Sequence, residues 1–149
     1  MKRYFLIFAL GVVCLFSACE MHHSDNGVLD GFWQMTSVDT IGGQSADMRQ
    51  SRVFWCIQGD VLQMQHMNGV LYEEGQGIVA FRFELKGKNL TVTNPVVCDR
   101  QSSDSILTNL TIVNPYGINN LKESFQVLCL DGSTMSLEST MLRLYFRRY

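Results

Sequence analysis

Short segments in which apolar and polar residues alternate, separated by tight turns, run through most of this 149-residue chain. The clearest is segment 78–85, whose apolar side chains occupy every second position: Val79, Phe81, Phe83 and Leu85. Gly59-Asp60 and Asp131-Gly132 are typical two-residue turns of β-hairpins. Since strand side chains point alternately to opposite faces, each segment predicts a short strand. About seven to nine such strands predict an all-β fold, either a closed barrel or a sandwich.

The predicted strands are short and are separated by turn residues. They cover residues 29–38, 52–58, 61–67, 78–85, 90–93, 124–130, 134–137 and 140–149. Pro95 is expected to end the strand at 90–93, because proline cannot donate a hydrogen bond to a neighbouring strand. Residues 41–51 predict a turn followed by an ambiguous polar stretch. Segment 105–113 predicts either a strand or a helical turn, and 114–117 a loop.

The composition is that of one globular domain and argues against nucleic-acid binding. Hydrophobic residues make up 46% of the chain and charged residues 17%, which is enough apolar material for a core. The formal net charge is −2, and basic residues cluster only near the C-terminus, at Arg143, Arg147 and Arg148. Nucleic-acid binding begins with a positive surface, so we expect no nucleic-acid partner.

The first residues predict an export signal. Two basic residues are followed by the apolar run from Tyr4 to Phe16, which is too short to span a bilayer and has the length of a signal-peptide core. The run Leu15-Phe16-Ser17-Ala18-Cys19 resembles a bacterial lipobox, which predicts lipidation at Cys19. The alternatives are Cys14, although Val13 before it is not small, and an ordinary secretory signal with an incidental cysteine.

Lipidation at Cys19 would divide the chain into three parts. Residues 1–18 would be the lipoprotein signal peptide, residues 19–27 a polar tether, and residues 28–149 the barrel domain. Two or more acyl chains make membrane anchoring stable. We therefore expect a lipid-anchored protein of a bacterial cell envelope, with the membrane as its partner. Whether it lies at the outer membrane, on the periplasmic side or on the surface stays open.

Both ends of the predicted barrel domain resemble those of lipocalin-type domains. The first strand begins with Gly31-Phe32-Trp33, and alternation divides its side chains into two sets: Trp33, Met35 and Ser37 against Phe32, Gln34, Thr36 and Val38. In lipocalins such a tryptophan closes one barrel end and an arginine of the last strand lies across it. The resemblance therefore implies that Gly31, Trp33 and Arg148 form a structural closure.

Taken with the C-terminal run to Tyr149, the chain is similar over residues 27–149 to lipocalin-like lipoproteins of anaerobic Gram-negative bacteria. This resemblance implies an eight-stranded antiparallel up-and-down barrel of the lipocalin or calycin type. It also implies a generic binding role, since family members of this kind mostly lack a defined ligand.

A small apolar or amphipathic ligand would be held by the large inward side chains of the barrel. The candidate lining residues are Trp55, Met64, Phe81, Phe83, Phe125 and Met135. An eight-stranded barrel is just wide enough either to be filled by side chains or to hold one small ligand, and both outcomes use the same residue types. The alternative is therefore a filled barrel that acts as an interaction or structural protein through its outer surface, where Tyr145 and Tyr149 would cluster.

The sequence offers little material for catalysis. The predicted domain has one histidine, His66, and three thiols, Cys56, Cys98 and Cys129, without the spacing of a metal site. We therefore expect no enzyme, no cofactor and no metal; the pair His22-His23 on the tether lacks a nearby third ligand. Two of the three thiols could form a disulfide, and the sequence does not indicate which. The oligomeric state stays open.

Overall fold

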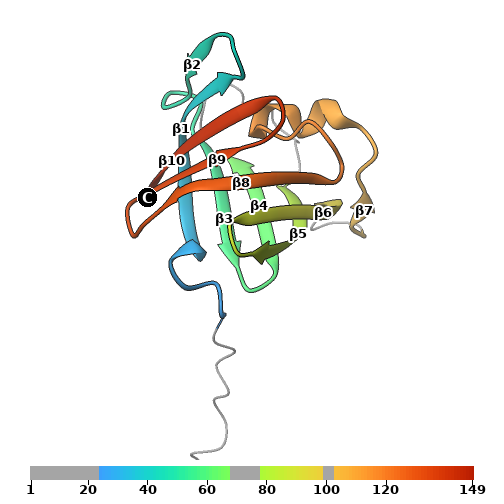
Figure 1. The fold of residues 1–149 in the computed structure, drawn as a ribbon. Helices are drawn as coiled ribbons and strands as arrows, with labels where there is room; N and C mark the ends of the chain where they lie inside the picture. Colours follow the sequence, from blue (N-terminus) through green and yellow to red (C-terminus); the bar gives the residue numbers. More distant parts are fainter. Residues whose placement is uncertain (1–23, 68–77, 99–102) are drawn as a thin grey trace, which may run out of the picture.

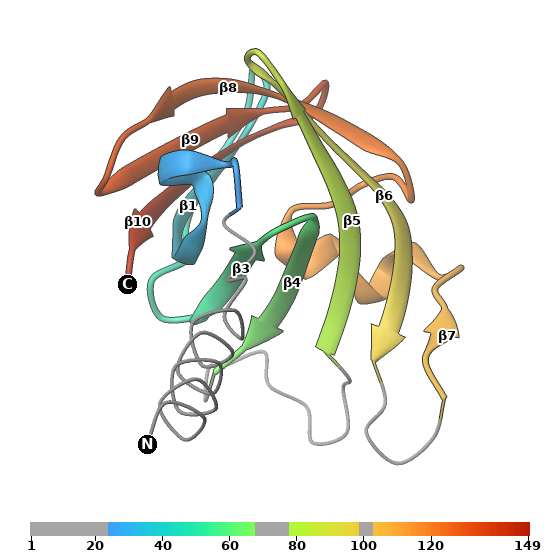
Figure 2. The same cartoon turned by 90° about the horizontal axis from the view of Figure 1, so that it is seen from below.

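The computed structural model describes residues 24–67, 78–98 and 103–149 and contains a closed antiparallel β-barrel. Strand β1 pairs with both β3 and β10, which closes the ring (Figure 1). The barrel strands are β1 (Gly31–Thr40), β3 (Val53–Gln58), β4 (Val61–His66), β5 (Ile78–Lys86), β6 (Asn89–Cys98), β8 (Glu123–Leu130), β9 (Thr134–Glu138) and β10 (Leu142–Arg148). The predicted eight-stranded up-and-down barrel is confirmed. Figure 2 shows β3, β4, β5 and β6 side by side in this order.

Five short elements complete the described chain. They are η1 (Gly27–Leu29), β2 (Ser45–Asp47), β7 (Ser105–Ile106), η2 (Leu110–Ile112) and η3 (Asn114–Tyr116). We call the barrel end at which η1 lies, β1 begins and β10 finishes the N-terminal end; the turns 59–60, 87–88 and 131–133 lie at this end as well. No helix in the described ranges is long and apolar enough to span a membrane.

Strand β6 continues through Pro95 to Cys98, so the prediction that Pro95 ends this strand is wrong. Asn94 adopts a left-handed backbone with φ 52°, and the register to β5 shifts between Ala80 and Arg82. Such a β-bulge places the proline where the ladder requires no N–H donor. The Pro95 carbonyl instead accepts a hydrogen bond from the Leu107 amide at 3.0 Å.

A second bulge changes the faces of β1. The register to β10 shifts between Met35 and Ser37, so the predicted alternation holds for Trp33 and Met35 and then reverses. Beyond the bulge Val38 packs against the core, although the predicted alternation placed it on the face opposite to Trp33. The far half of β1 also pairs with β2, a short strand that the sequence did not predict.

Candidate functional site

The N-terminal end of the barrel is closed by an indole and a guanidinium. Trp33 is fully buried, and its ring Nε1 donates to the carbonyl of Leu29 in η1 at 2.8 Å. The guanidinium carbon of Arg148 lies 5.2 Å from the centre of the Trp33 ring, a cation–π distance. Arg148 also donates to the carbonyls of Asp30, at 2.6 Å, and Val28, at 3.3 Å. One side chain of β10 thus holds the chain that leads into β1.

Gly31 is required at this end for two reasons. Its φ is +147°, a backbone conformation that other residues rarely adopt, and a Cβ there would lie 2.6 Å from Nη2 of Arg148. The lack of a side chain lets the guanidinium lie against the backbone. Gly31, Trp33 and Arg148 therefore form one unit, which stabilises this end of the barrel.

The six candidate lining residues lie together in the interior, within one buried cluster. Trp55, Met64 and Phe125 are 0% exposed, Phe81 and Met135 are 1% exposed, and Phe83 is 9% exposed. The Trp55 ring meets Phe125 edge-on at 5.8 Å and contacts Phe146 at 5.0 Å. A side chain beside a water-sized void would expose surface to it. Trp55, Met64, Phe81, Phe125 and Met135 are at most 1% exposed, so the interior around these five residues is filled by side chains.

The barrel end opposite η1 is occupied by residues 107–121, which we call the plug segment (Figure 1, orange). Its η2 and η3 turns connect β7 to β8, and four of its apolar side chains are buried in the barrel core: Leu107, Val113, Tyr116 and Ile118. The Trp55 Nε1 donates to the carbonyl of Tyr116 at 3.1 Å, which ties the plug segment to the barrel wall. The lining candidates are thus covered at this end by chain that the sequence predicted only as strand, helical turn or loop.

Two further contacts hold the plug segment in place. Glu123, the first residue of β8, is buried, and its Oε2 accepts from the backbone amides of Asn119, at 2.6 Å, and Asn120, at 3.2 Å. Gly117 ends η3 in the left-handed conformation with φ +84°. It lies so close to β10 that a Cβ would be 2.8 Å from the Leu144 side chain.

We predict that Gly117→Ala destabilises the barrel by about 2 kcal/mol, because alanine adds both backbone strain and an overlap with Leu144. Gly87→Ala is the matched control, since Gly87 has φ +60° and a Cβ added there would meet no atom within 4 Å. Urea unfolding of the two variants separates the backbone strain from the overlap. Equal losses would show that the contact with Leu144 contributes nothing.

His66, the one histidine of the predicted domain, contacts the plug segment. Its ring packs edge-on against Tyr116 at 4.7 Å, and both ring nitrogens are buried without a hydrogen-bond partner among the described residues. Burial lowers the pKa of His66 below its usual 6.5. The folded state therefore favours the neutral imidazole.

The lowered pKa of His66 has a consequence for stability. Between the folded pKa and about 6.5 the unfolded chain binds more protons than the folded one, so the free energy of unfolding rises with pH in that window. We predict that the wild type is less stable at pH 5 than at pH 7. His66→Phe keeps a ring against Tyr116 and should reduce this difference in thermal unfolding. An unchanged difference in the variant would assign the effect to other groups.

The three thiols are free, so the described chain contains no disulfide between them. Burial raises the pKa of Cys56 to about 11, and burial together with Asp104 raises the pKa of Cys98. Cys129 is exposed. A reactive cysteine needs a lowered pKa, which neither Cys56 nor Cys98 has. Among the residues that the structure describes, no cluster of three or more histidine, cysteine, aspartate or glutamate side chains could hold a metal ion.

The outer surface carries an aromatic cluster formed by Phe32, Phe54 and Tyr149. Phe32 stacks on Phe54 with ring centres 4.7 Å apart, and Tyr149 meets both rings edge-on at 5.7 and 5.1 Å. Phe54 points outward from β3 and yet is fully buried, while Tyr149 remains exposed. Tyr145 points outward on β10, as the sequence predicted, and is half-buried.

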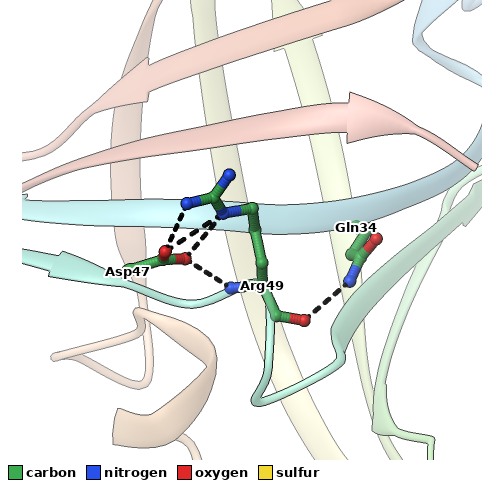
Figure 3. A network of polar contacts seen from close by, with 3 residues as sticks. All are labelled: Gln34, Asp47 and Arg49. Carbon is green, nitrogen blue, oxygen red and sulfur yellow. Dashed lines mark hydrogen bonds and ion pairs between the residues drawn. The ribbon is translucent and has the colours of Figure 1, made fainter.

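A polar network begins at Gln34, which lies opposite Phe54 in the pairing of β1 with β3. Figure 3 shows Gln34, Asp47 and Arg49 of this network. Gln34 accepts two hydrogen bonds from Arg147, at 2.7 and 2.9 Å, and donates to the carbonyl of Arg49 at 3.2 Å. Arg49 forms an ion pair with Asp47 at 2.5 Å, and its hydrogen bonds lower the pKa of Asp47 to about 2. Because this pair is exposed, it contributes little stability. The connection between β2 and β3 is held against β1 by the hydrogen bond from Gln34 to the Arg49 carbonyl.

Three hollows lined by described residues lie on the outside of the barrel. One of about 480 Å³ lies beside the aromatic cluster and is lined by Asp30, Gly31, Phe32, Cys56, Ile57 and Gln58. A second, of about 340 Å³, lies at the turn after β1, and a third, of about 450 Å³, lies over β5 and β6. The described structure thus offers concave surface outside the barrel, whereas the six lining candidates are packed together inside it.

Comparison with known proteins agrees with this architecture. A crystal structure of a lipocalin-like protein from Bacteroides uniformis ATCC 8492 superimposes with a TM-score of 0.59 at 22% identity, covering 83% of this chain and 100% of that one. An uncharacterized protein from Bacteroides eggerthii DSM 20697 superimposes with a TM-score of 0.60 at 19% identity, covering 80% and 98%. No curated protein matches the chain. The sequence profile of the lipocalin-like domain matches residues 14–149, and the chain therefore belongs to the lipocalin-like domain family.

Proposed function

We propose that this protein is a lipid-anchored component of a bacterial cell envelope, in which a filled lipocalin-like barrel is a rigid scaffold that acts through its outer surface. The observation that carries the proposal is the packing of Trp55, Met64 and Phe125, which are fully buried among other side chains. Pockets for drug-sized ligands have volumes of roughly 300–1,000 Å³. Space of that size would leave part of these side chains exposed.

The anchor in this proposal is supported by the sequence around Cys19, which lies outside the described residues. A lipid at that position would hold the barrel beside a membrane. On the outer surface, Tyr149 is exposed and packs against Phe32 and Phe54, and it supplies an aromatic side chain of a kind that is common at interfaces.

A second candidate function is the binding of a small apolar or amphipathic ligand inside the barrel. The observation that favours it is a set of buried polar atoms in or near the plug segment that have no hydrogen-bond partner among the described residues. These atoms are the ring nitrogens of His66, Nδ2 of Asn119 and Oε1 of Glu123. A ligand would have to displace the apolar side chains of the plug segment and take their place against Trp55. The ligand's polar end would then meet these groups.

Thermal unfolding with added lipids distinguishes the two candidates. A ligand at 100 times its dissociation constant stabilises the folded state by about 2.7 kcal/mol. We expect that oleate and a lysophospholipid leave the midpoint of the barrel unchanged, and that native mass spectrometry finds no non-covalent ligand. A rise in the midpoint, together with altered Trp55 fluorescence, would contradict the filled scaffold and establish the second candidate. Trp55→Phe is the control for the fluorescence change.

A further inference from the structure

We infer that the N-terminal end of the barrel rests on the lipid surface in which the protein is anchored, and that the opposite end points away from it. The interaction surface comprises Val28, Phe32 and Tyr149, and its partner is a layer of lipid headgroups. The inference rests on the proposed lipid anchor at Cys19.

The point at which the chain joins the barrel is fixed. The Asn26 side chain donates to the carbonyl of Gly59, at 2.5 Å, and to Oδ1 of Asp30, at 2.8 Å. Asn26 is thereby held against the turn between β3 and β4, at the N-terminal end. Together with the hydrogen bond from Arg148 to the Val28 carbonyl, these contacts leave the start of the described chain little freedom relative to the barrel.

The length of chain before this point limits the orientation of the barrel. Ser24, the first described residue, is five positions after Cys19, and five fully extended residues span at most about 18 Å. Strand β1 has ten residues, so its two ends are about 30 Å apart along the strand, or about 23 Å apart along the barrel axis at the usual strand tilt. If the opposite end of the barrel faced the membrane, Ser24 would lie farther from the lipid than the chain can reach. Upright and tilted orientations remain, and both bring the N-terminal end to the membrane.

The surface at the N-terminal end has the chemistry of a membrane interface. Val28 is 47% exposed and Tyr149 is 64% exposed, and the Tyr149 amide donates to the Phe32 carbonyl at 2.9 Å. The open hollow beside Phe32 adds apolar surface next to them. Tyrosine is favoured at membrane interfaces, because its ring is apolar and its hydroxyl stays hydrated.

The charges at this end are mixed. The exposed cations Lys88, Arg147 and Arg148 lie at the same end as the carboxylates of Asp25 and Asp131, and Asp60 is paired with Arg82 at 2.5 Å. An attraction to anionic lipid is therefore balanced by nearby carboxylates. We expect the contact to persist on vesicles of phosphatidylcholine as well as on vesicles that contain phosphatidylglycerol.

The opposite end has its own exposed apolar pair. Ile41 and Met141 are 53% and 55% exposed, and the Ile41 amide donates to the Met141 carbonyl at 2.9 Å. In the inferred orientation this pair lies on the side of the barrel away from the lipid. Ile41 is therefore a matched position for a probe, since it is an exposed aliphatic residue like Val28.

The test places an environment-sensitive fluorophore at one end of the barrel or at the other, in two variants of the lipid-modified protein. Val28→Cys and Ile41→Cys are each made in a background with Cys56, Cys98 and Cys129 replaced by serine, since an acylated Cys19 does not react with the dye. The proteins are reconstituted into phosphatidylcholine vesicles that carry a nitroxide on the headgroup. We expect the fluorescence at position 28 to fall by about half and that at position 41 to stay unchanged, because the two ends are about 23 Å apart along the barrel axis.

Two results would overturn the inference: equal quenching at both positions, or stronger quenching at position 41. Mass spectrometry of the same protein measures the lipid on Cys19 separately. An absent lipid overturns the proposed anchor. A lipid that is present, with equal fluorescence quenching at positions 28 and 41, overturns only the orientation. If the background with the three serine substitutions does not fold, hydrogen exchange of the unaltered protein replaces the fluorophore measurement. In that measurement, vesicles must slow exchange at Phe32 and Tyr149 and leave Ile41 unchanged; no such difference would refute the orientation.

Discussion

Replacement of Trp55 by alanine is expected to lower the free energy of unfolding by about 3–5 kcal/mol. The indole is fully buried and packs against Phe125 and Phe146, so its removal leaves a cavity at the centre of the barrel. The substitution also removes the hydrogen bond to the Tyr116 carbonyl, which ties the plug segment to the wall. A loss of this size is a large part of the roughly 5–15 kcal/mol that stabilises a typical domain.

Urea unfolding followed by far-ultraviolet circular dichroism measures this loss without relying on tryptophan fluorescence. Trp55→Phe retains most of the apolar volume but not the hydrogen bond, and it should cost less than the alanine variant. Tyr149→Ala is the surface control, since Tyr149 is mostly exposed. A loss below about 1 kcal/mol for Trp55→Ala would indicate that the indole borders empty space already.

Replacement of Cys19 by serine is expected to abolish lipid attachment. Each buried methylene of an acyl chain contributes about 0.8 kcal/mol, and two chains make the anchoring stable. Growth with a clickable fatty acid, followed by capture of the protein, measures the attachment directly. The label should be present on the wild type and absent from the variant.

Cys14→Ser is the matched control, because Cys14 is the other thiol in the predicted signal region. This variant should carry as much label as the wild type. Label that survives Cys19→Ser and disappears with Cys14→Ser would move the anchor to the earlier cysteine. Label that is absent from all three proteins would refute a lipid anchor altogether.

The barrel could be predicted from the sequence because its strands keep a two-residue period and its turns are chemically distinctive. Asp131 shows why the turns were recognisable: its carboxylate accepts hydrogen bonds from the amides of Ser133 and Thr134, both at 2.7 Å. Aspartate and glycine favour such turns in any chain, so the signal is local. The Trp33 and Arg148 closure followed from a family resemblance that links the two ends of the domain.

The bulges could not be predicted in the same way. An extra residue in β1 after Met35 and the left-handed Asn94 before Pro95 both depend on how neighbouring strands pair. Asparagine tolerates the left-handed conformation, so Asn94-Pro95 offered a weak sign of a bulge. Pro95 was instead interpreted as the end of a strand, so the predicted strand at 90–93 is shorter than β6.

The plug segment was missed because its buried residues follow neither strand nor helix periodicity. Leu107, Val113, Tyr116 and Ile118 are separated by six, three and two positions, and their burial depends on the open barrel end that they occupy. The run at residues 114–117 predicted a loop but not its position beside Trp55. For the same reason the sequence predicted which side chains face inward, but not whether they fill the barrel.

The packed interior is the central claim, and xenon tests it most directly. Xenon enters dry apolar cavities in protein crystals and marks them with strong electron density. Crystals of this protein held under xenon should show no site among Trp55, Met64 and Phe125, because their side chains already fill that space. A xenon atom or a bound acyl chain at that position would contradict the filled barrel and make the interior a ligand site.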